Sequence, residues 1–193
     1  MNVAEQIKEE VAKCLTVLKS GGIILYPTDT IWGIGCDATN EEVVKKIFIL
    51  KNRDDSKGFI VLLDAPEKLN KYVKDVPAQA WDLIEYSEKP LTIVYPGAVN
   101  IAKNLIADDG TAAIRIVKND FCSELIHKSG KPLVSTSANI SGEIAPLSFS
   151  EINSDILSKV DYVVNLPHEK NKTGKPSTII KIELNGVIKF LRK

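Results

Sequence analysis

The sequence predicts a single α/β or α+β domain built around a mixed sheet. Short apolar runs typical of strands recur along all 193 residues, and amphipathic helical stretches lie between them without strict alternation. Hydrophobic residues make up 44% and charged residues 26% of the chain, which excludes disordered, collagen-like and low-complexity proteins. This length suits one domain, which we place over residues 1–193.

Helices are predicted where apolar residues recur at helical spacing between recognisable ends. The first, over 3–18, carries an apolar stripe on one face and stops at Gly21-Gly22. Asn40 caps the second, whose acidic first turn precedes inward-facing apolar residues up to position 50. Further helices are expected over 77–86 and 120–128.

Strands are predicted from short apolar or alternating runs bounded by turn residues. In the run 111–117, Ile114 and Ile116 lie on one face, whereas Ala113 and Arg115 lie on the other. The complete set of strands is expected over 23–26, 59–63, 91–95, 111–117, 133–135, 162–166, 178–182 and 187–191.

Charge and cysteine content restrict the class of protein. Twenty-five basic residues balance twenty-five acidic ones, which argues against a protein that coats nucleic acid or a membrane surface. Cys14, Cys36 and Cys122 have no short mutual spacing and predict structural thiols in a reducing compartment. The amino-terminal stretch has no apolar signal core, and no apolar run approaches the ~20 residues that span a bilayer. We therefore expect a cytoplasmic protein without membrane contact.

Several familiar catalytic motifs are absent from the sequence. It contains no phosphate-binding GxxxxGK[ST], no GxGxxG after a strand and no GxSxG nucleophile elbow. Its only two histidines, His127 and His168, lie in unrelated contexts. A histidine-based triad or a histidine-rich metal site is therefore not expected, and no metal ligands are assigned.

Arginine is used sparingly. Lysine is the default surface cation, and the only arginines are Arg53, Arg115 and Arg192. The planar guanidinium fork suits carboxylates and phosphates better than the ammonium group of lysine. Each arginine is therefore a candidate for a specific anion contact, with a structural salt bridge as the alternative.

Small polar segments stand at the ends of predicted strands, where open α/β sheets bind ligands. Hydroxyl and amide groups of this kind can hold oxyanions, although ordinary turns and solvated loops have similar compositions. Together with the arginines, they favour binding of polyanions and transfer of a phosphoryl-type group. The segments are 26–35, 51–59, Thr111 with Arg115, 135–142, 176–178 and Arg192.

Four of these motifs, in this order, make the chain resemble the YrdC-like family of threonylcarbamoyl-AMP synthases. The motifs are YPTDTIWGIGCDA, KNRDDSKGFIVLL, STSANISG and PSTII. The resemblance runs from about Gly21 to Arg192, and we place the motif-bearing part at about 14–192. It implies a twisted, mixed parallel and antiparallel sheet around a large, open, positively charged cleft, as in YrdC/RibB-like folds.

The resemblance also implies an activity. Family members form threonylcarbamoyl-AMP and pyrophosphate from L-threonine, bicarbonate or CO2, and ATP, and Mg²⁺ would accompany the ATP. The product feeds the N6-threonylcarbamoyladenosine modification of tRNA. Implied partners are the downstream threonylcarbamoyl-transfer proteins and, as a further contact, tRNA or double-stranded RNA.

Roles are carried over residue by residue from the family motifs. The catalytic set would be Lys51, Arg53, Ser137 and Asn139. ATP would be bound by Arg53, Lys57, Thr111, Ser137 and Arg192. Threonine would be bound by Thr30, Arg115, Ser135 and Ser177, with the Arg115 fork on its carboxylate. The chain departs from the usual pattern at Asp29 (commonly Glu), Trp32 (commonly Tyr), Gly58 (frequently Pro) and Leu62 (often His).

Three alternatives stay open from the sequence. A YciO-like paralogue would have a similar cleft and a different or weaker reaction. A non-catalytic module would use the cleft for double-stranded RNA or tRNA, which zero net charge and 6% aromatic residues disfavour. A carbamoyl-transfer domain of a hydrogenase-maturation protein is disfavoured because no zinc-finger or acylphosphatase-like domain is fused.

Overall fold

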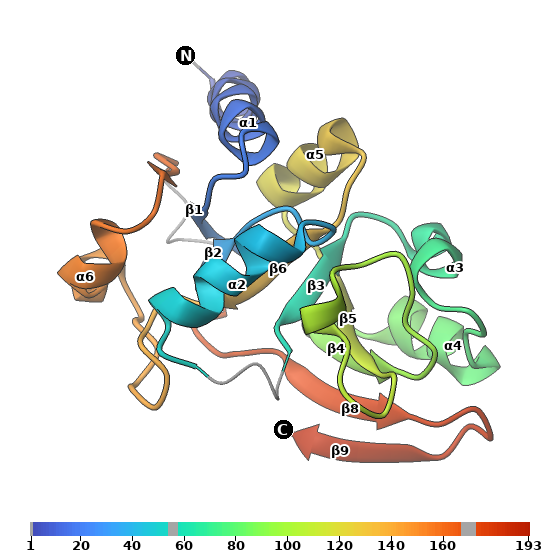
Figure 1. Cartoon of the computed structure of the whole chain (residues 1–193). Helices are drawn as coiled ribbons and strands as arrows, with labels where there is room; N and C mark the ends of the chain where they lie inside the picture. The colour runs from blue at the N-terminus through green and yellow to red at the C-terminus, as the bar shows by residue number, and fades with distance from the viewer. Residues whose placement is uncertain (1, 54–57, 167–172) are drawn as a thin grey trace.

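The computed structural model describes residues 2–53, 58–166 and 173–193 (Figure 1). Within these ranges the strands form one nine-stranded sheet in the order β7-β1-β2-β6-β3-β5-β4-β8-β9. β1–β7, β3–β5 and β4–β8 pair in parallel, and the other neighbours pair antiparallel. The predicted single α/β domain with a mixed sheet is therefore confirmed. The strands are β1 (Ile24–Pro27), β2 (Trp32–Gly35), β3 (Ile60–Leu63), β4 (Leu91–Tyr95), β5 (Ala112–Ile116), β6 (Leu133–Ser137), β7 (Tyr162–Val163), β8 (Thr178–Ile182) and β9 (Ile188–Arg192).

Helices cover both faces of the sheet. α1 and α5 pack together on one face, whereas α2, α3 and α4 contribute to the core on the other (Figure 1). The helices are α1 (Val3–Lys19), α2 (Glu41–Leu50), α3 (Leu69–Tyr72), α4 (Ala78–Tyr86), α5 (Asp120–Ser129) and α6 (Ser154–Leu157), with 3-10 turns η1 (Pro66–Lys68), η2 (Lys103–Leu105) and η3 (Phe149–Glu151).

Local capping explains why the main helices begin where the sequence predicts. The side chains of Asn2, Asn40 and Asn119 accept hydrogen bonds from the first-turn backbones of α1, α2 and α5. Each such cap stabilises a helix by about 1 kcal/mol. Asn52 follows the end of α2 with a φ of 50°, a left-handed conformation that stops the helix. The chain therefore leaves α2 at the residue before Arg53.

One face of the sheet is only partly covered by helices. Ile24, Tyr26 and Leu62 lie with α1 and α5 in one hydrophobic cluster. Ile60 lies two residues before Leu62 in β3, so its side chain points to the same face. Ile60 lines a cavity beyond the helices, so this uncovered part of the sheet forms the floor of that cavity.

Strand β2 was not predicted. Its sequence, Trp32-Gly33-Ile34-Gly35, lies in the polar segment 26–35, whose proline, aspartate and glycine residues are typical of turns. A Cβ at position 35 would lie 2.1 Å from the Val134 carbonyl oxygen and 2.7 Å from the Tyr26 ring. The glycine therefore lets the Tyr26 ring cross β2, where its hydroxyl donates to the Val134 carbonyl at 2.9 Å.

Two short helices, α3 and α6, were also not predicted, and the other differences concern element ends. The structure has β7 over Tyr162–Val163 in place of the longer strand expected over 162–166. β6 extends to Ser137, so two residues assigned to a polar turn belong to the strand. Pro77 is the N-cap of α4 and does not lie inside its first turn. In the described ranges, no helix combines the length and apolar character needed to cross a membrane.

Candidate active site

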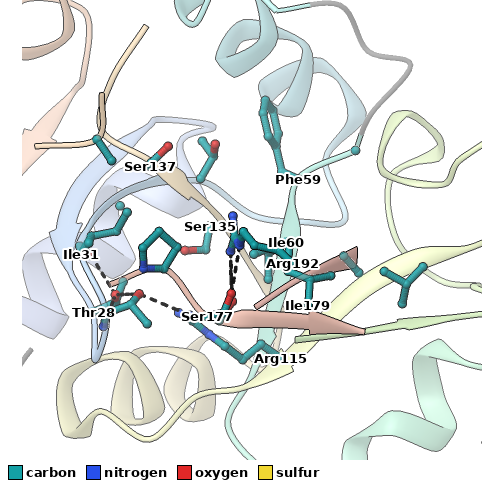
Figure 2. A pocket seen from close by; sticks show the side chains of 18 of the residues that line it. Thr28, Ile31, Phe59, Ile60, Arg115, Ser135, Ser137, Ser177, Ile179 and Arg192 are labelled. Atoms are coloured by element: carbon teal, nitrogen blue, oxygen red, sulfur yellow. Dashed lines mark hydrogen bonds between the residues drawn. The ribbon is translucent and has the colours of Figure 1, made fainter. Parts of the chain in front are cut away.

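A cavity of about 580 Å³ opens on the uncovered face of the sheet (Figure 2). This volume lies within the usual range for small-molecule sites, about 300–1,000 Å³. Strand ends and loops far apart in the sequence meet here, as expected for ligand sites of open sheets. Of the predicted site residues, the cavity is lined by Thr30, Arg53, Thr111, Arg115, Ser135, Ser137, Asn139, Ser177 and Arg192.

Lys51 and Lys57 are the two predicted site residues that are not among the lining side chains. Lys57 lies outside the described residues. Lys51 is 1% exposed, and its ammonium group donates to the carbonyl oxygens of Ser137 at 2.5 Å and Asn139 at 2.6 Å. The structure therefore places the Lys51 charge behind the cavity wall, on the backbone that carries two of the lining residues.

Arg53 enters the cavity from the end of α2. Its guanidinium carbon lies 5.1 Å from the centre of the Phe59 ring, and Phe59 stacks on Phe48 at 4.1 Å. Burial lowers the pKa of Arg53 from its ordinary value, but a guanidinium remains charged at neutral pH. Across the described residues, no carboxylate forms a salt bridge with Arg53. An aromatic face thus holds this cation at the cavity.

The loop after β6 contributes Ser137 and Asn139. The Asn139 amide nitrogen donates to the carbonyl oxygens of Ile140 at 2.9 Å and Glu143 at 2.8 Å. Turning the amide over would place its oxygen against two carbonyl oxygens, so this network fixes its orientation. The Asn139 amide oxygen is buried and has no hydrogen-bond partner in the described residues.

Arg115 and Asp29 form a buried ion pair at the other end of the cavity. A terminal guanidinium nitrogen of Arg115 lies 3.2 Å from an Asp29 carboxylate oxygen, and the side chains are 3% and 10% exposed. The other terminal nitrogen donates to the Thr30 hydroxyl at 3.3 Å. The Thr28 hydroxyl lies 2.7 Å from that of Thr30 and donates to the Ile31 carbonyl at 2.8 Å. The hydroxyl groups of Thr28 and Thr30 therefore form a short hydrogen-bonded chain that ends at Arg115.

Ser177 contacts Thr92 of β4 and Arg192 of β9, and Figure 2 shows Arg192 next to Ser177. Arg192 donates to the Ser177 carbonyl at 3.0 and 2.9 Å, and one of its nitrogens lies 3.4 Å from the Ser177 hydroxyl. That hydroxyl is 2.7 Å from the hydroxyl of Thr92 in β4. Burial, followed by the nearby charge of Arg115, lowers the pKa of Arg192.

Thr111 is held from outside the cavity. Its hydroxyl donates to the Asp109 carboxylate at 2.6 Å, and Lys181 of β8 pairs with the same carboxylate at 2.6 Å. These contacts, led by Lys181, lower the pKa of Asp109 to about 2. Thr111 and Arg115 both line the cavity with Ala113 between them, which confirms the predicted common face.

Sequence reasoning did not single out Asp29 or Thr92 as site residues. Asp29 stands in the predicted polar segment 26–35, at a position where the family commonly has Glu, but its partner Arg115 is 86 positions away. Thr92 carried a local signal, because it is the polar residue inside the otherwise apolar run of β4 and is fully buried. A buried hydroxyl in such a run requires a hydrogen-bond partner.

The departures from the family pattern have structural counterparts. Leu62 neighbours Arg115 across the β3–β5 pair but is fully buried in the cluster with α1 and α5. A Cβ at position 58 would lie 2.7 Å from the Leu105 carbonyl oxygen, so only glycine fits there without movement. The Trp32 ring packs against Phe149, with centres 5.3 Å apart.

Comparisons with known proteins identify the family and the fold of this chain. The sequence model of the Sua5/YciO/YrdC domain, described as "Telomere recombination", matches residues 16–193. The chain belongs to the Sua5/YciO/YrdC family. A curated relative from Pseudoalteromonas translucida (strain TAC 125), named threonylcarbamoyl-AMP synthase, is 36% identical over 181 residues, covering 92% of this chain and 95% of the relative.

Solved structures of the family have the same fold. The structure of Pyrococcus abyssi Sua5 complexed with L-threonine superposes with a TM-score of 0.82 at 27% identity, over 92% of this chain and 52% of that one. The chain thus spans about half the length of that Sua5. Escherichia coli YciO has a TM-score of 0.79 at 20% identity, over 95% of this chain and 88% of that one, which is a likeness of fold alone.

Proposed function

We propose that this protein is an L-threonylcarbamoyladenylate synthase, a nucleotidyltransferase that joins L-threonine, bicarbonate or CO2 and the AMP part of ATP. The observation that carries the proposal is the single cavity into which the strand-end polar segments converge. The names of the curated relatives and the threonine complex of Sua5 support it. They favour this function over the YciO-like and RNA-binding alternatives.

The two ends of the cavity suit two different substrates. The end with Arg115 offers a buried guanidinium and hydroxyl groups, which match the carboxylate and hydroxyl of threonine. The end with Arg53, Ser137 and Asn139 offers a cation and hydrogen-bonding groups for the phosphates. Thr111 and Arg192 line the cavity as well, where we assign them to the nucleotide.

The reaction requires two bond-forming steps. The amine of threonine adds to CO2 and loses a proton, which gives an N-carboxylate. An oxygen of that carboxylate attacks the α-phosphorus of ATP, the bond from this phosphorus to the bridging oxygen breaks, and pyrophosphate leaves. Because the nucleophile and the triphosphate are both anionic, catalysis depends on positioning and on cations such as Arg53.

We assign Mg²⁺ to the substrate, as the complex with ATP. No group of three His, Cys, Asp or Glu side chains in the described ranges is arranged to hold a metal ion. Mg²⁺ prefers oxygen ligands, and at the cavity wall the carboxylate of Glu143 and the amide oxygen of Asn139 are groups of this type. The ion bound to ATP would neutralise phosphate charge beside Arg53.

Pyrophosphate release tests the proposal. The purified protein is incubated with ATP and Mg²⁺, and threonine and bicarbonate are added separately and together. We expect rapid pyrophosphate release only in the complete mixture. Release that ignores threonine, or release of inorganic phosphate alone, contradicts the proposal.

The biological setting is part of the same proposal. The three cysteines are buried free thiols, which suits the reducing cytoplasm. The adenylate would be consumed by threonylcarbamoyl-transfer proteins that modify tRNA. Direct contact with tRNA or double-stranded RNA, and the positive potential of the cleft, remain predictions.

A further inference from the structure

Lys51 connects the end of α2 to the loop after β6 through three hydrogen bonds. Its ammonium group donates to the carbonyl oxygens of Ser137 and Asn139, at 2.5 and 2.6 Å. Its own carbonyl oxygen accepts from the backbone N–H of Ser141 at 2.9 Å. The side chain and backbone of one residue therefore hold both ends of the segment 137–141, which is more than 85 positions away in the sequence.

Burying this ammonium group is costly, and the structure offers it no carboxylate at hydrogen-bonding distance within the described residues. Burial, followed by the charge of Arg53, lowers the pKa of Lys51 to about 8, while Glu143 acts in the opposite direction. A group of this kind persists only where its hydrogen bonds offset the cost of desolvation. A methionine would fill the same space without that cost.

We propose that Lys51 is a positioning residue, whose ammonium group holds the Ser137–Asn139 backbone in place and does not contact the phosphates of ATP. Its charge-assisted hydrogen bonds turn the two carbonyl groups away from the cavity. The Ser137 and Asn139 side chains are then presented to the substrate, while Arg53, two residues further on, supplies the cation at the cavity itself. The kinetic part of this inference rests on the proposed function.

Hydrogen exchange provides a test that does not depend on activity. In the ligand-free Lys51→Met protein we expect the backbone amides of 138–141 to exchange roughly 10- to 100-fold faster, as the loss of charge-assisted hydrogen bonds implies. Lys45→Met is the matched control, because Lys45 is an exposed lysine of the same helix. Unchanged exchange at 138–141 in the Lys51→Met protein overturns the inference.

A double-mutant cycle tests the catalytic consequence. Lys51→Met should lower kcat on the order of 10²-fold, since a displacement of about 1 Å at reacting groups has that effect. If Lys51 acts through the loop, adding Ser137→Ala to Lys51→Met should lower kcat much less than Ser137→Ala does alone. If the fold-losses in kcat of the two single variants multiply in the double variant, Lys51 contacts the phosphates independently and the inference is overturned.

Two further controls keep the result interpretable. If Lys51→Met does not fold, as judged by thermal unfolding, Lys51→Gln is measured in the same way. If exchange at 138–141 rises but the wild-type protein releases no threonine-dependent pyrophosphate, the positioning role stands and the proposed function fails. If the wild-type protein is active and exchange is unchanged, the proposed function stands and the positioning role fails.

Discussion

The arginines at the two ends of the cavity have different surroundings. Arg53 lies over an aromatic ring and has no salt bridge to a carboxylate in the described residues, whereas Arg115 is paired with Asp29 in a buried site. A cation that lies over an aromatic ring can still pair with an anionic ligand that brings its own charge. A cation already neutralised recognises its ligand through hydrogen-bond geometry more than through net charge. The first arrangement suits phosphates and the second suits a small amino acid.

The largest effect is expected from breaking the Arg115–Asp29 pair. Asp29→Asn leaves a buried guanidinium without its counter-charge, which should lower the free energy of unfolding by about 3 kcal/mol. Denaturant unfolding measures this loss. Asp29→Glu retains the charge and should be milder. Equal stabilities of Asp29→Asn and the wild type would show that the pair does not matter for the fold.

Arg53→Ala should lower activity and leave the stability of the fold nearly unchanged. Removing a fully engaged donor to the transition state lowers the rate of pyrophosphate release on the order of 10²-fold or more. The fold should persist, because the change leaves no buried carboxylate of residues 2–53, 58–166 and 173–193 without its counter-charge. A folded Arg53→Ala protein that releases pyrophosphate at a near-normal rate contradicts the assignment of Arg53 to the phosphates.

Arg115→Lys tests recognition by geometry. A point charge replaces a planar fork, so the KM for threonine should rise about tenfold, while the KM for ATP changes little. Initial rates at varied threonine measure this shift. An unchanged dependence on threonine removes Arg115 from the amino-acid end.

A smaller effect is expected at Thr92. Thr92→Val removes the hydroxyl beside Ser177, which should cost roughly 1 kcal/mol of stability and raise the KM for threonine slightly. Thr92→Ser keeps the hydroxyl and serves as the control. If Thr92→Ser and Thr92→Val have the same stability and the same KM for threonine, the hydroxyl of Thr92 does not support Ser177.

The pH dependence separates activity from stability. Because the pKa of Lys51 is about 8 in the folded protein, kcat/KM should decline as pH rises above 8, while the ammonium group loses its proton. In the unfolded chain Lys51 has its ordinary pKa of 10.5, so between pH 8 and 10.5 the unfolded state binds more protons than the folded state. The contribution of Lys51 to the free energy of unfolding should therefore rise with pH in this range. Comparing pH profiles of the wild type and Lys51→Met checks both signs.

The sequence predicted the four longer helices and most of the strands because their signals are local, whereas the four-residue helices α3 and α6 carry too few residues for a helical pattern. Asn40 and Asn119 mark helix starts, and the alternation around Arg115 assigns its face correctly. Strand β2 was missed because Gly35 is required by the close approach of the Val134 carbonyl and the Tyr26 ring, a contact between strands that no local pattern reveals.

The sequence predicted which residues line the site better than it predicted the contacts between them. Most of the residues predicted for the site line one cavity, but the Asp29–Arg115 pair and the Lys51 contacts join positions far apart in the chain. The family motif assigned Lys51 to the catalytic set together with Arg53, Ser137 and Asn139. Only its burial and its two carbonyl acceptors distinguish a group that positions a loop from one that meets the substrate.

We propose that one cavity joins all three substrates. Labelled bicarbonate, supplied with ATP and threonine, tests it most directly by mass spectrometry of the adenosine-containing products. We predict that the labelled carbon appears in a compound that carries both AMP and threonine, and only when threonine is present. Consumption of ATP without any labelled adenylate, under conditions that preserve such a compound, would contradict the account.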